Sequence, residues 1–135
     1  MKRIYIGIAA FLAAVSAQAD NLDGVDRLLC AAAQVQICIE YDTCYAATPA
    51  ELDVPNFVVI DLDKKIVSTT KASNENRSTK FSSVATEAGL IYLQGLDGGR
   101  AFSFVIDEAS GRLTVAVSRD GLSVSVFGAC TDADI

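Results

Sequence analysis

Residues 91–126 alternate between apolar and polar side chains, and three short segments rich in glycine and acidic residues divide the run. These segments are residues 97–99, 108–111 and 120–121. A two-residue turn at 120–121 places Val115 opposite Val126, and a four-residue loop at 108–111 places Phe104 opposite Val115. A two-residue turn at 97–98 adds Ile91 opposite Phe104. One apolar stripe then crosses four strands, which predicts an antiparallel sheet with one buried face.

The remaining patterns favour more strands of the same kind. The opposite face of residues 100–126 is polar and comprises Ser103, Asp107, Arg112, Thr114, Ser118, Ser123 and Ser125. Strand-like runs also occur at residues 57–62, 65–70, 81–86 and 90–94. The sequence therefore predicts an all-β, mainly antiparallel fold, either a small up-and-down barrel or a strongly curved sheet. Aromatic residues make up only 7% of the chain, which favours a filled interior without a roomy ligand cup.

The beginning of this fold is ambiguous in the sequence. The stretch 26–34 is ambiguous between a strand and a helix, because its three consecutive alanines also suit a helix, and we expect a short helix or turn there, followed by a strand to about Glu40. From Leu29 the residues alternate up to Ile39, which places Leu29 with Val35 and Ile37 on one face and Cys30 on the other. Residues 46–56 contain two prolines and are expected to connect strands with at most one helical turn.

The N-terminus has the composition of a secretory signal peptide. Lys2 and Arg3 precede an apolar run at 4–15, and Ala17 and Ala19 match the small residues of a cleavage site. The run is short, whereas a membrane-spanning helix needs about 20 residues. We expect residues 1–19 to be removed and residues 20–135 to form a single β domain. That domain would be periplasmic or secreted, with no stable membrane anchor.

The charge balance argues against polyanionic partners. Two of the 11 basic residues and none of the 17 acidic residues lie in 1–19, so the mature chain would carry a net charge of −8. This charge repels phosphate backbones and anionic lipid headgroups. No cluster of lysine and arginine with interleaved aromatic residues offsets it. We therefore expect no nucleic-acid binding and consider a protein partner instead.

Four cysteines, Cys30, Cys38, Cys44 and Cys130, follow the leader. An even number of cysteines in an exported chain indicates disulfides, and three pairings are possible. We favour Cys38–Cys44 with Cys30–Cys130, because the residues between Cys38 and Cys44 form a polar-tipped turn that can join two strand ends. Zinc or redox sites use cysteine pairs separated by two residues, and the chain has no such pair.

The absence of histidine removes the commonest general base and the commonest zinc ligand. Carboxylate pairs for a glycosidase or a calcium site could come only from acids beside turns, and aspartate commonly stabilises a turn there. These acids are Asp61, Asp63, Asp107, Glu108, Asp132 and Asp134. We therefore predict a protein that is not an enzyme, with no catalytic residues, no metal and no cofactor.

Residues 69–80 contain the most polar stretch of the chain, in which Lys71, Asn74 and Arg77 are candidates for contact with a partner. Such a loop on a β scaffold is either mobile or a contact surface. The leading hypothesis is a non-enzymatic binding or accessory module of unknown partner, acting through this loop or a sheet face. A hydrolase based on carboxylates and a small-ligand carrier are the other hypotheses, and an exposed cavity would favour the carrier.

Two resemblances extend this interpretation. The hairpin sequence Ile106-Asp-Glu-Ala-Ser-Gly-Arg112 and the ending Gly128-Ala-Cys130 resemble small exported proteins of proteobacteria, which implies a bacterial periplasm and no particular activity. The chain also resembles, more faintly, the MliC-type β-barrel inhibitors of C-type lysozyme. In that family a Ser-Gly-x-Arg/Lys hairpin plugs the lysozyme cleft, so this resemblance implies that Ser110 and Arg112 are the inserted pair.

Overall fold

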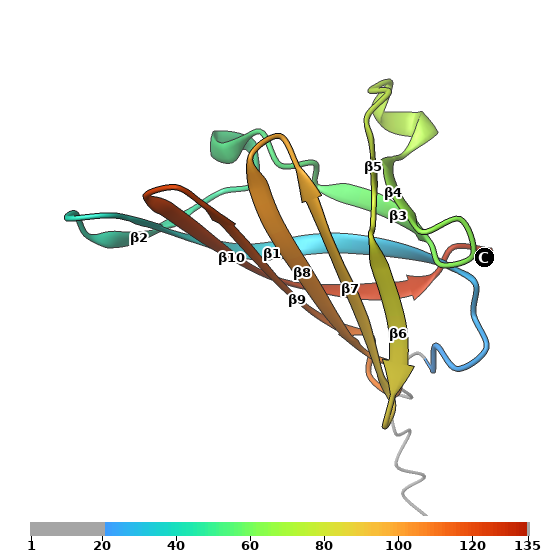
Figure 1. Ribbon diagram of the computed structural model, residues 1–135. Helices are drawn as coiled ribbons and strands as arrows, with labels where there is room; N and C mark the ends of the chain where they lie inside the picture. Colours follow the sequence, from blue (N-terminus) through green and yellow to red (C-terminus); the bar gives the residue numbers. More distant parts are fainter. Residues whose placement is uncertain (1–20, 135) are drawn as a thin grey trace, which may run out of the picture.

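The structure, a computed structural model, describes residues 21–134, and the predicted signal peptide at 1–19 lies outside the described residues. The fold is all-β, as predicted (Figure 1), with 61% of residues 21–134 in strands. The strands are β1 (Arg27–Ile39), β2 (Cys44–Ala47), β3 (Phe57–Asp61), β4 (Ile66–Thr69), β5 (Ser78–Lys80), β6 (Ser83–Glu87), β7 (Leu90–Asp97), β8 (Arg100–Asp107), β9 (Arg112–Arg119) and β10 (Leu122–Asp132). Two short 3-10 turns, η1 (Ala50–Leu52) and η2 (Lys71–Ser73), interrupt the loops.

All strands belong to one antiparallel sheet that curls into a half-barrel. The strand order is β5-β4-β3-β1-β10-β9-β8-β7-β6, and β2 pairs with β1 outside this path. Figure 1 shows the curl, with β3 and β4 on one side of the molecule and β7 and β8 on the other. The structure therefore corresponds to the strongly curved sheet, one of the two predicted architectures.

Two of the three predicted turns have the expected register. Val115 pairs with Val126 across the turn at 120–121, and Phe104 pairs with Val115 across the loop at 108–111. The third prediction was wrong by two residues, because Ile91 pairs with Ile106 and Leu93 with Phe104. The turn consists of Gly98 and Gly99, whose φ angles of 58° and 77° suit a two-residue hairpin turn of type I′. A two-residue shift leaves every side chain on its predicted face.

A β-bulge interrupts the alternation of side chains in β1, so the predicted uninterrupted alternation of that strand was wrong. The pairing with β10 shifts between Ala32 and Gln34, which leaves Ala33 as the extra residue. Cys30, before the bulge, is therefore buried on the same face as Val35, whereas the uninterrupted pattern placed them on opposite faces. Gly128 of β10 makes the close approach possible, since a Cβ there would overlap the carbonyl oxygen of Ala31.

The start of the domain contains a turn and no helix. β1 begins at Arg27 and occupies most of the stretch 26–34, so the expectation of a short helix or turn there was wrong, and the turn lies before it at residues 23–24. Leu22, before the turn, is 1% exposed, and its N–H donates to the carbonyl oxygen of Glu108 at 2.7 Å. The N-terminal segment thus covers the end of the half-barrel where the loop between β8 and β9 lies.

Phe81 marks the point at which the chain passes from one edge of the sheet to the other. β5 pairs with β4, and β6 pairs with β7, within one extended segment (Figure 1). The N–H of Phe81 donates to the oxygen of Lys65 at 2.8 Å, and the N–H of Ser82 donates to the oxygen of Gln94 at 2.8 Å. The segment therefore bridges the two edges, and Phe81 points into the core, where it is 4% exposed.

The two disulfides have the predicted pairing, Cys30–Cys130 and Cys38–Cys44. Cys30 and Cys130 are opposite each other on β1 and β10 and are buried in the core. Cys38 and Cys44 join the end of β1 to the start of β2 at the surface. Two disulfides indicate an oxidising environment outside the cytoplasm.

Candidate functional site

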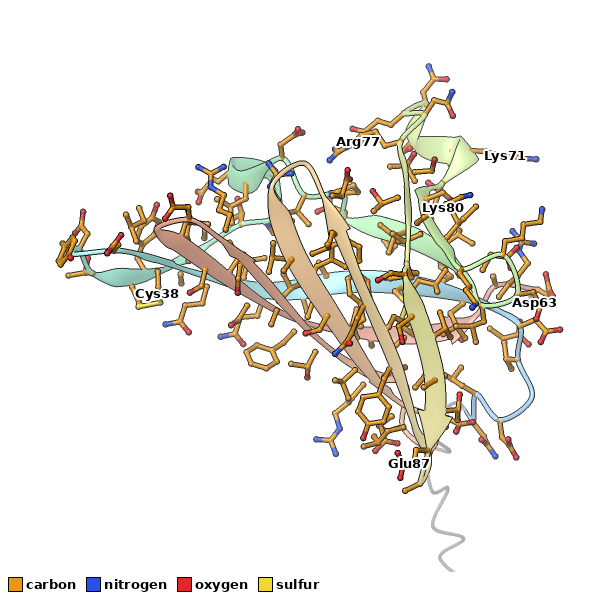
Figure 2. The ribbon with its side chains drawn as sticks, in the orientation of Figure 1. Cys38, Asp63, Lys71, Arg77, Lys80 and Glu87 are labelled. Carbon is orange, nitrogen blue, oxygen red and sulfur yellow. A yellow bond between two sulfur atoms is a disulfide. The ribbon has the colours of Figure 1, made fainter. Side chains whose placement is uncertain are left out.

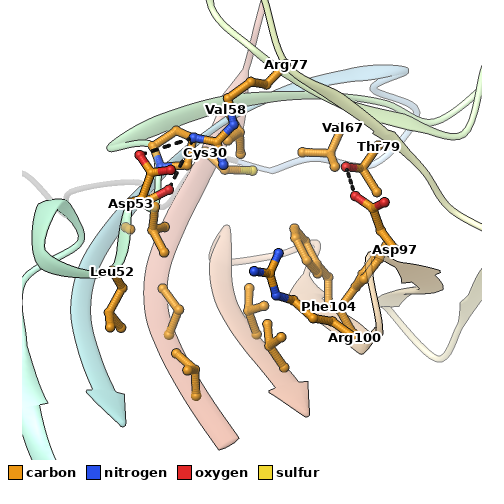
Figure 3. A pocket seen from close by; sticks show the side chains of 18 of the residues that line it. Cys30, Leu52, Asp53, Val58, Val67, Arg77, Thr79, Asp97, Arg100 and Phe104 are labelled. Atoms are coloured by element: carbon orange, nitrogen blue, oxygen red, sulfur yellow. Dashed lines mark hydrogen bonds and ion pairs between the residues drawn. The ribbon is translucent and has the colours of Figure 1, made fainter. Parts of the chain in front are cut away.

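The concave side of the half-barrel contains a cavity of about 550 Å³. Apolar side chains of β8, β9 and β10 form one wall, and mostly small side chains of β1, β3 and β4 form the other. The first wall comprises Phe102, Phe104, Leu113, Val115, Val117, Leu122, Val124 and Val126, and the second comprises Cys30, Ala31, Ala32, Ile37, Val58 and Val67. Leu52, the last residue of η1, and Val54 also line the cavity, and Figure 3 shows Leu52 at one side of it.

The expectation of a filled interior without a ligand cup was therefore wrong. Phe81, Phe102 and Phe104 pack edge to face, with ring centroids 5.3 to 6.0 Å apart, and fill the part of the interior next to β5 and β6. No aromatic side chain of β1, β3 or β4 lines the opposite part of the cavity. Apart from Ile37, the apolar side chains of these three strands that line the cavity are no larger than valine, so the space between the walls stays open.

Polar groups surround the apolar walls. A guanidinium nitrogen of Arg77 lies 3.6 Å from a carboxylate oxygen of Asp53 and 3.7 Å from one of Glu75. On the other side, the hydroxyl of Thr79 donates to a carboxylate oxygen of Asp97 at 2.9 Å. Figure 3 shows these two groups on opposite sides of the cavity, with Arg100 next to Asp97. The cavity is thus apolar inside with a charged margin.

Two further arginines at this margin were missed as candidate residues. Arg100 begins β8 and Arg119 ends β9, one position beyond the pair Ala101–Ser118, and both line the cavity. Neither forms an ion pair within 4.0 Å with any residue between 21 and 134. The predicted register of the 108–111 loop already places them opposite each other, so the signal was present in the sequence.

The structure divides the three candidates of the 69–80 segment. Arg77 belongs to the cavity margin, whereas Lys71 and Asn74 are exposed beyond it. Figure 2 shows Lys71 and Arg77 extending from opposite sides of this loop. The loop is an ordered turn in which Thr69 Oγ1 donates to Glu75 O at 3.0 Å and accepts from Arg77 N at 3.1 Å. Its last residues form β5, so residues 71–80 are not one uninterrupted loop.

Ser110 and Arg112 lie at the other end of β8 and β9 from Arg100 and Arg119. The Asp107 carboxylate accepts from the N–H of Ala109 at 2.9 Å and of Ser110 at 3.1 Å. Ser110 Oγ accepts from the N–H of Arg112 at 3.2 Å, and the Arg112 side chain is exposed on the convex face. The Ser110 hydroxyl and the Asp107 carboxylate therefore stabilise the hairpin, as acids beside turns were expected to do.

Gly111 in this hairpin provides a stability prediction with a matched control. Its φ angle is 74°, and a Cβ there would overlap the carbonyl oxygen of Cys130. Gly24 has the same φ angle with nothing within 4 Å of its Cβ position. We expect Gly111→Ala to lower the free energy of unfolding by about 3 kcal/mol and Gly24→Ala by about 1 kcal/mol, measured by urea denaturation. Equal losses would mean that backbone conformation alone matters at both positions.

Comparison of the chain with protein-family models, with curated proteins and with solved structures gives no match. The candidate site therefore depends on the geometry of the chain itself.

Residues 21–134 include no helix with the length and hydropathy that a bilayer-spanning segment requires.

Proposed function

We propose that the protein is a non-enzymatic binding module that holds an elongated apolar ligand in the cavity of its half-barrel. The observation that carries the proposal is the cavity itself, which lies within the size range of small-molecule sites, roughly 300–1,000 Å³. Its walls are apolar and its polar groups are confined to the margin, as is typical of such sites. This proposal develops the small-ligand carrier, one of the hypotheses drawn from the sequence, which an exposed cavity favours.

The proposed location is the periplasm or the extracellular space. The disulfides support an oxidising compartment, and the leader-like composition of residues 1–19 supports export. A carrier in such a compartment keeps an apolar molecule out of water while it crosses an aqueous space.

Binding of a neutral fluorescent probe such as N-phenyl-naphthylamine tests the proposal. We expect its fluorescence to rise on binding to the wild-type protein. Val117 of β9 lines the cavity, whereas Ala116 is exposed on the convex face. Val117→Asn is expected to weaken binding about tenfold, because a polar amide replaces apolar contact, and Ala116→Asn is expected to leave binding unchanged. Val124→Asn on β10 repeats the test from the neighbouring strand.

Two results would contradict this function. The first is the absence of probe binding by wild-type protein whose circular dichroism shows a folded sheet. The second is equal loss of binding in the variants at 116 and 117. Inhibition of a C-type lysozyme by the wild type, abolished in Ser110→Ala/Arg112→Ala, would instead support the alternative function that the MliC resemblance implies.

A further inference from the structure

We infer that the cavity takes a single-chain amphiphile with a carboxylate head, such as a long-chain fatty acid, and that Arg100 and Arg119 bind its head. This inference rests on the proposed function and specifies the class of ligand.

The register brings the two arginines together on the cavity side of the sheet. Residues two apart on a strand share a face, so Arg100 lies on the face of Phe102 and Arg119 on that of Val117. Phe102 and Val117 are paired and line the cavity. Residues opposite each other in an antiparallel pair have Cβ atoms about 5 Å apart. Two guanidinium groups from these positions can therefore reach one carboxylate.

The margin of the cavity is less negative than the protein as a whole. The charged residues that line the cavity are Asp53, Arg77, Asp97, Arg100 and Arg119, a net charge of +1 that becomes 0 when Glu75 beside Arg77 is included, whereas the whole chain carries −6. Arg77 is compensated by Asp53 and Glu75. Asp97 accepts the hydroxyl of Thr79 and partly offsets the remaining two arginines. Arg100 and Arg119 thus provide a local positive charge without an ion-pair partner among the described residues.

The position of Arg100 opposite Arg119 lowers the stability of the folded protein. Like charges directly opposite each other destabilise an antiparallel pair, and nothing in the core requires arginine at these exposed positions. A bound anion between the two side chains would offset the repulsion. A locally unfavourable pair at the margin of a cavity is a departure from optimal stability of the kind that functional sites contain.

The apolar rows below the arginines suit an alkyl chain. Phe102 with Val117 and then Phe104 with Val115 follow along the two strands. With a rise of about 3.3 Å per residue, Phe104 lies roughly 13 Å along β8 from Arg100. A ligand with its head at the arginines therefore places its chain over four apolar side chains. The planar guanidinium matches a carboxylate in a bidentate manner, which favours this head group.

Competition for the probe by dodecanoate and by dodecanol tests the inference. The two molecules share an alkyl chain and differ in head group. We expect dodecanoate to bind about tenfold tighter than dodecanol to the wild type at low salt. Added salt should reduce the difference by screening. Arg100→Gln/Arg119→Gln should abolish the preference, keep the affinity for dodecanol and leave the thermal midpoint equal or higher, since a repulsion is removed.

A control variant separates local from overall charge. Lys64→Gln/Lys65→Gln also removes two positive charges, but from the turn between β3 and β4, outside the cavity lining. We expect this variant to keep the preference for dodecanoate. Loss of the preference in both double variants would mean that only the net charge of the protein matters and would overturn the inference.

Other outcomes identify other occupants. Equal affinity for dodecanoate and dodecanol, or displacement by acetate at equal concentration, would overturn the assignment of an amphiphile to the arginines. Binding to phosphatidylglycerol vesicles without binding of dodecanoate would indicate a membrane surface instead. A dimer that competes with the probe, seen by light scattering, would assign the cavity to a second copy of the chain. If neither dodecanol nor the probe binds the wild type, the proposed function itself fails.

Discussion

Replacement of both Cys30 and Cys130 by alanine is expected to lower the free energy of unfolding by about 5 kcal/mol, the largest effect of any change considered for this protein. The disulfide joins residues 100 positions apart, and cross-linking such a long loop removes much of the conformational entropy of the unfolded chain. Both sulfur-bearing side chains are also buried, so alanine leaves a space in the core. Urea unfolding followed by circular dichroism measures the change.

Cys38→Ala/Cys44→Ala is the matched control. This disulfide joins residues six positions apart at the surface, and the same model of chain entropy assigns it about 2 kcal/mol. Because Cys44 is exposed and Cys30 is buried, a reducing agent is expected to open Cys38–Cys44 first in the native protein. Equal losses of stability in the two double variants would show that loop length does not govern the effect here.

Phe81→Ala is expected to lower the free energy of unfolding by about 4 kcal/mol. The ring is 4% exposed and contacts Phe102 and Phe104 edge to face, with centroids 5.5 and 5.3 Å apart. Loss of the ring removes buried apolar area and two aromatic contacts at the position where the chain crosses between the edges of the sheet. Probe binding is expected to weaken as well, because Phe102 and Phe104 line the cavity.

Two further variants separate the contribution of Phe81 from a general effect of removing phenylalanine. Phe57 is 53% exposed, so Phe57→Ala is expected to cost less than about 1 kcal/mol. Phe81→Leu retains most of the apolar contact and is expected to cost about 1.5 kcal/mol or less. A loss in Phe81→Ala no greater than that in Phe57→Ala would contradict the role assigned to the crossing segment.

Several features of the fold could be predicted because they depend on residues close together in the chain. The loop at 108–111 and the turn at 120–121 have the predicted lengths, and the strands between them have the predicted partners. The turn at 97–99 shows the limit of this approach. Asp97 with Gly98 and Gly98 with Gly99 are both good turns, and they differ by a register shift that keeps the apolar stripe on one face. The apolar pattern alone cannot distinguish them.

The candidate site was only partly predictable, because it depends on contacts between segments that are far apart in the chain. Arg77 was selected because its segment is polar, yet its contact with Asp53 depends on the tertiary structure, which brings the residue after η1 close to the residue before β5. Arg100 and Arg119 could be placed opposite each other from the loop length, but nothing local indicates that their face lines a cavity. Lys71 and Asn74 were selected on composition, and the structure leaves them outside the cavity margin.

The sequence by itself determined most of the strands from residue 57 onward, the register across the turns at 108–111 and 120–121, and the face of each side chain between 91 and 126. These features follow from alternation with a period of two and from turn residues that need only their neighbours. The tertiary structure alone decided how far the sheet curls and where the interior stays empty. Curvature depends on the bulge at Ala33, on the close approach at Gly128 and on the crossing at Phe81. These are contacts between segments far apart in the chain, and side-chain alternation does not encode the distance between two walls.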